Sequence, residues 1–361
     1  MALLFMDSFD HYATADIGEK WTEIQFLFAS FASVTINAGT GRHSSASYRL
    51  STGNSTQQQI ALRKNCTAAD ATSILGFAFT FQASDIIGTS GWQIASIRDG
   101  STSQVSLRLN SDLRLSVVRG TVAGTVLGTT SGSISAGSYT YIEWKVKVDA
   151  SVGTVDLRVN GASVLSLTSQ NTRNTANTSW NSFALGNYDS VGSSSTTVNG
   201  RSIDYDDVYI LDGSGAAPWN TFLGDVRVDA RKPTGAGTTT GWTPLSSTNW
   251  SNVDDAAPDD DTTYNSTSTL NAIDTFVVED APVAGATIYG IQHCLSMKKS
   301  DAGTCTVAPV IRHSGTNNSG TSISPGTSYA YGLQIATEIA PGVAITESNF
   351  NAAEFGYVRI T

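Results

Sequence analysis

Three aspartates near residue 205 carry oxygen ligands that could bind a metal ion. Asp204, Asp206 and Asp207 lie in 201–211, where apolar and polar residues alternate as in a half-buried strand. Carboxylate oxygens are hard ligands of the kind that Ca²⁺ prefers. The alternative is that these side chains hydrogen-bond neighbouring loop backbone where the strand begins. A second acidic run, 254–261, is either a metal loop or a solvated turn. We therefore expect no cofactor, or Ca²⁺ at one of these clusters.

Catalytic motifs of hydrolases are missing from the chain. Glycoside hydrolysis needs two carboxyl groups about 5 to 9.5 Å apart, and on sandwiches they usually follow a Glu-x-Asp-x-x-Glu run that this sequence lacks. Glu143 stands beside Lys145 and Lys147 without an acidic neighbour, so we expect Glu143→Gln to change only local charge. No Gly-x-Ser-x-Gly elbow accompanies any of the four histidines, which are His11, His43, His293 and His313. We expect that the protein is not an enzyme.

Aromatic residues outside the strands could bind sugars by stacking. The candidates are Trp180, Tyr188, Trp219, Trp242 and Trp250. The alternative is burial, which we expect for Trp21, Trp92 and Trp144 in their strand contexts. Trp219 is expected to be wedged between domains. Trp242 and Trp250 flank loops and are retained as candidate ligand-binding residues.

Composition restricts the partners. Charged residues make up 14% of the chain and the net charge is −10, against about 25% charged residues in typical globular proteins. The basic doublets at 63–64, 231–232 and 298–299 are isolated, so we expect no nucleic-acid partner. No stretch is long and apolar enough to predict a membrane span, and the short apolar start predicts no export signal. Synthesis in a cytoplasm is expected.

Three cysteines are too few for a disulfide framework. Cys66 falls in the first half of the chain, and Cys294 and Cys305 fall in the second. We expect three free thiols, the alternative being that Cys294 and Cys305 face each other across a hairpin. Neither has the companion residues of a zinc site.

Alternating strands dominate the chain and predict an all-β fold. In 139–149 the residues Ile142, Trp144, Val146 and Val148 would face a core, and Glu143 would face water. Asn160-Gly161 predicts a type I′ hairpin turn. Single helical turns are expected at 14–20 and 348–354, and loops at 170–179, 190–200 and 234–240. Many short strands without intervening helices predict antiparallel sandwiches.

Two domains are predicted from a turn-rich connector between two alternating segments. Gly213, Gly215 and Pro218 punctuate the connector. An antiparallel jelly roll is expected at 1–213, a linker at 214–221 and a smaller β-sandwich at 222–361, opened by a strand at 222–231.

Both ends of both predicted domains resemble structural proteins of tailed bacteriophages. The opening 4–12 (LFMDSFDHY), followed by 17–21 (IGEKW), is similar to the start of concanavalin A-like, laminin-G-type jelly rolls in such proteins, and 203–212 (IDYDDVYILD) to their closing strand. In the second half, 223–228, 249–255, 259–264 and 351–356 resemble a phage β-module that often follows. The resemblance implies a virion location and a non-enzymatic tail or tail-fibre component. The alternatives are a capsid-decorating protein and a carbohydrate-binding or carbohydrate-cleaving module.

The expected partners follow from the resemblance and the low charge. We expect other copies of the chain, with a trimer favoured, other phage virion proteins, and a glycan of the host surface. The loops at 170–179 and 190–200 are then expected to be ordered by neighbouring copies.

Overall fold

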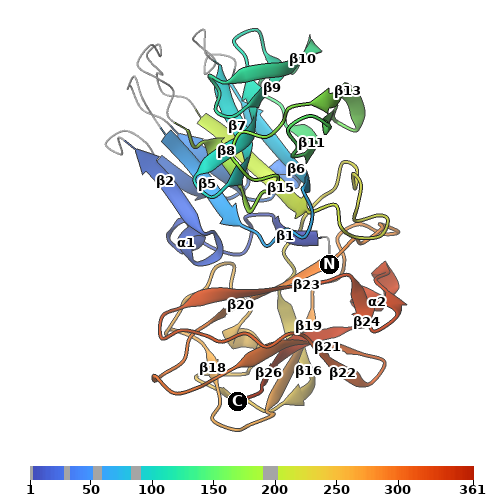
Figure 1. Ribbon diagram of the computed structural model, residues 1–361. Helices are drawn as coiled ribbons and strands as arrows, with labels where there is room; N and C mark the ends of the chain where they lie inside the picture. Colours follow the sequence, from blue (N-terminus) through green and yellow to red (C-terminus); the bar gives the residue numbers. More distant parts are fainter. Residues whose placement is uncertain (1–2, 28–32, 52–58, 83–90, 190–201) are drawn as a thin grey trace. The chain divides into compact units, whose positions relative to one another are not determined.

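The protein is an all-β chain of antiparallel sheets, as predicted, in a computed structural model that describes residues 3–27, 33–51, 59–82, 91–189 and 202–361 (Figure 1). Contacts divide the chain into two compact units. The first unit comprises Met1–Phe9 and Trp21–Val228, and the second comprises Asp10–Lys20 and Asp229–Thr361. This division differs from the predicted domains in two places, because 10–20 belong to the second unit and 222–228 to the first. The loop expected at 190–200 lies outside the described residues.

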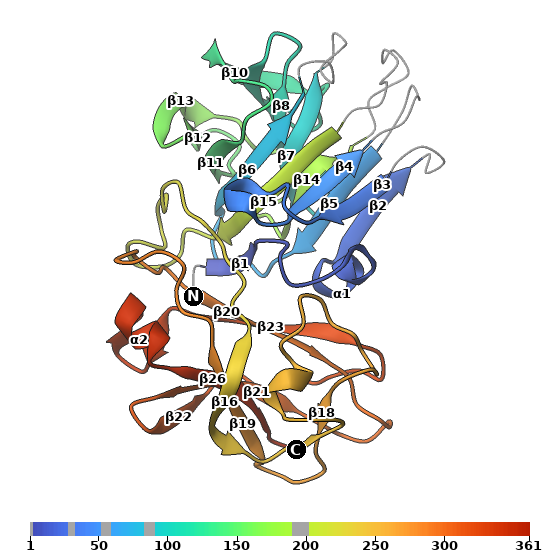
Figure 2. The ribbon, with the colours of Figure 1, turned by 180° about the vertical axis from the view of Figure 1, so that it is seen from behind.

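Two large sheets form the first unit (Figure 1; Figure 2). In the described residues the eight-stranded sheet has the order β13-β12-β11-β6-β15-β4-β3, with β1 paired to β15, and the seven-stranded sheet has the order β10-β9-β8-β7-β14-β5-β2. The strands of the first sheet are β1 (Leu3–Asp7), β3 (Ser33–Asn37), β4 (Ser47–Ser51), β6 (Thr72–Phe81), β11 (Thr140–Lys147), β12 (Gly153–Val159), β13 (Ala162–Gln170) and β15 (Ser202–Leu211). Those of the second are β2 (Glu23–Leu27), β5 (Gln59–Asn65), β7 (Trp92–Asp99), β8 (Thr102–Leu109), β9 (Arg114–Arg119), β10 (Thr125–Ser133) and β14 (Ser182–Asn187).

The core of the first unit lies between these sheets. The buried hydroxyl of Tyr205 on β15 donates a hydrogen bond to the carbonyl of Ile94 on β7 (2.9 Å), and the rings of Phe5 and Phe183 lie 6.2 Å apart. The predicted hairpin is confirmed, since Asn160 and Gly161 both have positive φ and Val159 pairs with Ala162. The strands predicted near 3–9, 139–149 and 201–211 are confirmed as β1, β11 and β15.

The second unit contains a five-stranded sheet and three strand pairs. Its core gathers buried residues such as Ile339, Ile345 and Phe350. Helical turns occur near both predicted positions, at Thr14–Lys20 and Glu347–Asn351. The sheet consists of β16 (Pro233–Thr240), β19 (Ile273–Val278), β26 (Glu354–Arg359), β21 (Val307–His313) and β22 (Thr316–Ser319). The pairs are β17 (Thr243–Pro244) with β18 (Asn265–Ser266), β20 (Ile291–Met297) with β23 (Ala330–Ala336), and β24 (Glu338–Ala340) with β25 (Val343–Ala344); the α-helices are α1 (Ile17–Lys20) and α2 (Glu347–Asn351).

Residues 222–228, which we call the strap, correct two predictions. No strand forms anywhere in 212–232, although alternation predicted one at 222–231. The strap instead lies against the eight-stranded sheet, where Glu143 accepts hydrogen bonds from the Gly224 amide (2.8 Å) and the Tyr209 hydroxyl (2.7 Å). Glu143 is therefore fully buried. The strap covers it on the side of 139–149 that was predicted to face solvent.

A third correction concerns 234–240. We expected a loop from its threonines and glycines, but it forms β16 beside β19. The close approach of its partner explains Gly237, because a Cβ there would lie 2.5 Å from the Thr275 carbonyl oxygen.

Candidate functional site

The three predicted metal ligands lie close together, but protein groups hold their oxygens. Both oxygens of Asp204 bind the Arg49 guanidinium, at 2.8 and 2.9 Å. Asp206 accepts hydrogen bonds from the Arg42 amide (2.7 Å) and the Ser45 hydroxyl (2.8 Å). Across the described ranges, no three His, Cys, Asp or Glu side chains gather as metal ligands. Asp206 thus binds loop backbone, as in the hydrogen-bonding alternative, whereas Asp204 binds the side chain of Arg49 on β4 and not loop backbone.

Asp207 binds the strap instead. One of its oxygens accepts a hydrogen bond from the Val228 amide (2.7 Å), and the other pairs with Arg42 (3.2 Å). The Arg42 guanidinium also binds the Val226 carbonyl (3.1 Å) and Asp225. The carboxylates that were candidates for a cation thus bind two arginines, Arg42 and Arg49, and backbone amides of the first unit.

A different polar cluster lies on the outer face of the seven-stranded sheet. We call it the Tyr188 cluster; it consists of Tyr188, Glu23, Arg63, Arg98 and Asp189. The Tyr188 hydroxyl donates a hydrogen bond to Glu23 (2.8 Å), and Arg63 binds the same carboxylate oxygen (2.7 Å). The Arg98 guanidinium lies 3.8 Å from the centre of the Tyr188 ring and pairs with Asp189 (3.2 Å). Two cations and two anions therefore surround one phenol.

The sheet and its small residues determine where Tyr188 lies. Ala61 on β5 and Ala184 on β14 are fully buried and pack with the ring. Gln93 on β7 is also buried, and its side-chain oxygen accepts hydrogen bonds from the amides of Tyr188 and Asp189 (both 3.2 Å). These contacts fix the chain that leaves β14 on the outer face.

Burial and charge set the protonation of the cluster. Burial is the main cause that raises the pKa of Tyr188, and the hydrogen bond to Glu23 adds to it, whereas Arg63 and Arg98 act in the opposite direction. Tyr188 is therefore a neutral phenol near neutral pH. Burial also lowers the pKa of Arg98, and within the described chain its Nε has no hydrogen-bond partner.

Solvent reaches the cluster from the side of β2 and β5. The exposed fractions of the Glu23 and Arg63 side chains are 32% and 18%, while Tyr188 is 9% exposed and Arg98 is fully buried. A ligand would therefore contact Glu23, Arg63 and the hydroxyl edge of Tyr188. From the sequence, Tyr188 is expected only to stack on a sugar or to be buried. One signal in the sequence could have indicated a polar site here. Gln104, Ser106 and Arg108 alternate along β8, which predicts that the outer face of the seven-stranded sheet is polar.

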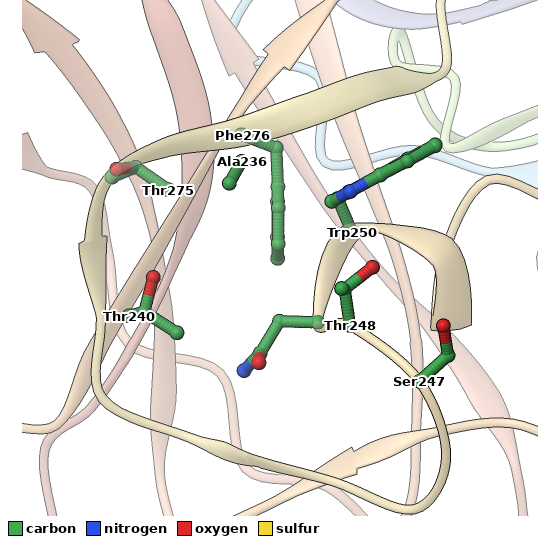
Figure 3. Close-up of a pocket in the computed structure, with 8 residues that line it drawn as sticks. Ala236, Thr240, Ser247, Thr248, Trp250, Thr275 and Phe276 are labelled. Carbon is green, nitrogen blue, oxygen red and sulfur yellow. The ribbon is translucent and has the colours of Figure 1, made fainter.

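The second unit contains a pocket of about 260 Å³ (Figure 3). It lies between β16, β19 and the 3-10 turn Trp250–Asn252. Trp250, predicted as a ligand-binding residue, lines it together with Phe276. Trp242, the other predicted ligand-binding residue, is not among the lining residues. Its indole donates a hydrogen bond to the Ala272 carbonyl (3.0 Å). Its ring packs edge-on against the Tyr357 ring, with 4.7 Å between the ring centres.

Comparisons with known proteins show no family for this chain. No family model matches the chain, and no curated protein matches it. Among solved structures, an endo-β-1,4-glucuronan lyase from the fungus Trichoderma reesei is 14% identical, with a TM-score of 0.45, over 57% of this chain and 94% of that one. The alginate lyase Aly36B is 14% identical, with a TM-score of 0.39, over 57% and 96%. The alginate lyase from Aplysia kurodai is 13% identical, with a TM-score of 0.39, over 50% and 87%.

These comparisons correct the expectation that the protein is not an enzyme. That expectation depended on the missing carboxylate pair of glycoside hydrolases, on the missing Gly-x-Ser-x-Gly elbow and on the phage resemblance. The solved structures named above are titled as lyases, a class of enzyme to which the motifs of hydrolases do not apply. In the described chain no helix is long and apolar enough to cross a membrane.

Proposed function

We propose that the protein cleaves an acidic polysaccharide by β-elimination at the Tyr188 cluster. The observation that carries the proposal is the 2.8 Å hydrogen bond from the Tyr188 hydroxyl to Glu23, with Arg63 on the same carboxylate. A general base and a general acid thus stand side by side, next to a cation that solvent can reach.

Each group has a chemical task. In a uronic acid the carboxyl group acidifies the adjacent C5–H. The Glu23 carboxylate would take that proton as the C4–C5 double bond forms and the C4–O bond breaks. Tyr188, neutral because its pKa is raised, would give its proton to the departing oxygen. Arg63 would pair with the substrate carboxylate and stabilise the charge that develops on it.

The hydrogen bond also lets Glu23 and Tyr188 return to their starting protonation states. After elimination Glu23 carries a proton and Tyr188 has lost one, and the two oxygens lie within hydrogen-bonding distance. The proton can return from Glu23 to Tyr188 directly. Arg98, stacked on the ring at 3.8 Å, would stabilise the transient tyrosinate as a positioning residue.

Hydrolysis is less well supported by the same residues. It requires two available carboxyl groups, whereas the second carboxylate of the cluster is already bound. Asp189 accepts hydrogen bonds from Gln93 (3.0 Å) and Ser103 (2.5 Å) and pairs with Arg98. The side chain of Glu23 is 32% exposed and that of Asp189 only 10%, and one accessible carboxylate beside a phenol fits elimination better.

The test is an activity screen on polyglucuronate, alginate and pectate, with cellulose and starch as neutral substrates. Elimination produces an unsaturated sugar, detected by its ultraviolet absorbance, and a fragment lighter by one water than a hydrolysis product. Tyr188→Phe and Glu23→Gln should each reduce the rate by about 10²- to 10⁴-fold. Tyr139→Phe is the matched control, since its hydroxyl donates a hydrogen bond to the carbonyl of Thr40, which lies between β3 and β4 of the other sheet. Full activity of Tyr188→Phe, or cleavage of neutral chains only, would refute the proposal.

The virion location and the trimer remain predictions of the phage resemblance. A polysaccharide-cleaving role is compatible with the host-surface glycan expected there as a partner.

A further inference from the structure

We infer that the pocket of the second unit is a binding site for a single neutral sugar residue, separate from the chemistry proposed at Tyr188. The lining residues share one property, which is the absence of a charged side chain. They are Ala236, Thr240, Ser247, Thr248, Thr275 and Phe276, together with Asn249 and Trp250. A site built from hydroxyls, an amide and two aromatic rings suits a ligand that is rich in hydroxyls and carries no charge.

Asn249 supplies a fixed hydrogen-bond acceptor. Its side-chain nitrogen donates to the Trp242 carbonyl (2.8 Å) and to Asp274 (2.6 Å), which determines the orientation of the amide. Its side-chain oxygen makes no hydrogen bond within the described residues. Asp274 is fully buried and is itself held by the Gly241 and Trp242 amides (2.6 and 2.9 Å). A buried anion therefore positions the amide at the pocket.

Two hydroxyl groups complete the polar side of the pocket. Those of Thr240 and Ser247 make no hydrogen bond to other described residues, and both residues are exposed. Thr248 and Thr275 are already engaged, with Ser251 (2.9 Å) and Glu354 (2.6 Å). The pocket thus offers one fixed acceptor and two hydroxyls that can donate or accept.

Phe276 and Trp250 give the pocket an apolar side. In Figure 3 the Phe276 side chain projects into the centre of the lining residues, with Thr240 on one side and Trp250 on the other. Phe276 is 4% exposed and belongs to the core, whereas Trp250 is half-buried. The C–H face of a pyranose can pack against such rings while its hydroxyls reach the polar side.

The size limits the ligand to about one ring. Pockets for drug-sized ligands measure roughly 300–1,000 Å³, and this one measures about 260 Å³. A terminal sugar or a single branch fits that volume. The two sites would then differ in substrate class, with an acidic chain at the Tyr188 cluster and a neutral sugar here.

Calorimetric titration and ligand-observed NMR with the methyl glycosides of glucose, galactose and mannose test the inference on the full chain. Methyl glucuronide is the charged comparison. At least one neutral glycoside should bind, and binding of the glucuronide should be at least about tenfold weaker, since no cation lines the pocket. Trp250→Ala and the surface variant Thr240→Val should each weaken binding by about tenfold.

Two controls keep this result separate from the proposed cleavage. Trp242→Phe changes an aromatic residue that does not line the pocket and should bind normally, with its folding checked by thermal unfolding. Tyr188→Phe should also bind the neutral glycoside normally, whatever it does to cleavage. The inference is overturned if none of the neutral glycosides binds, if the glucuronide binds as well as they do, or if Trp250→Ala and Thr240→Val both leave binding unchanged.

Discussion

Removal of the Arg42 side chain should destabilise the first unit and release the strap. The guanidinium pairs with Asp207 at 3.2 Å, donates to the Val226 carbonyl at 3.1 Å and lies 5.0 Å from the Tyr141 ring. Asp207 is only 2% exposed, so Arg42→Ala leaves a buried carboxylate without its cation, a change that typically costs about 3 to 5 kcal/mol. Arg42 itself is 18% exposed, so water can replace part of the loss. We expect the free energy of unfolding to fall by about 3 kcal/mol.

Denaturant unfolding followed by circular dichroism measures the loss, and amide hydrogen exchange locates it. The Gly224 and Val228 amides, bound to Glu143 and Asp207, should exchange faster in the variant. Arg114→Ala is the matched control, because its partner Asp112 is exposed, and it should change neither measurement. If Arg42→Ala is as stable as Arg114→Ala, or if exchange in the strap is unchanged, the reasoning about the strap is refuted.

Two predictions concern the second unit. Burial lowers the pKa of His293 to about 4, and its Nε2 is buried without a hydrogen-bond partner among the described residues. An unfolded histidine titrates near 6.5. The unfolded state therefore binds more protons than the folded state below that pH. The free energy of unfolding should therefore fall as the pH is lowered from 6.5 to 4, by at most about 3 kcal/mol. The part of that fall due to His293 should vanish in His293→Phe. An unchanged pH profile in the variant would contradict this. A Cβ at Gly356 would lie 1.9 Å from the Asp274 carbonyl oxygen, whereas one at Gly235 would meet nothing within 4 Å. Gly356→Ala should therefore lower the free energy of unfolding by about 3 kcal/mol or more, and Gly235→Ala by less than about 0.5 kcal/mol. Equal melting temperatures for the two variants would show that β19 and β26 can separate freely.

Strands with a distinct apolar face could be predicted from the sequence, and strands without one could not. In β15, Ile203 and Tyr205 alternate with aspartates, so the period of two is visible. β16 has only threonine, glycine, alanine and proline, and pairing with β19 determines its conformation. The strap shows the converse, since Leu223, Val226 and Val228 alternate but form no strand. Its amides bind the side chains of Glu143 and Asp207, which local sequence does not reveal.

The candidate sites depend on contacts between distant residues. Glu23 and Tyr188 are 165 residues apart in the chain, and the order of strands in the sheet brings them together. Neither residue belongs to a recognisable motif, so each side chain alone indicated nothing beyond a polar surface or a stacking ring. Trp250 was selected as an aromatic residue that flanks a polar loop, and it lines a pocket; its role in ligand binding stays a prediction. Trp242 had the same local signal, and only its contacts with Ala272 and Tyr357 distinguish it.

The path of the chain has a consequence for how this protein can be divided and recombined. Segment 10–20 belongs to the second unit although 1–9 and 21–228 belong to the first, so the backbone passes between the units at 9/10, 20/21 and 228/229. A cut in the connector at 214–221 would leave the first unit without its strap and the second without 10–20. Neither half of such a cut contains a complete unit. Gene fusion or recombination at one junction cannot exchange either unit as a cassette, and the two are expected to be inherited together.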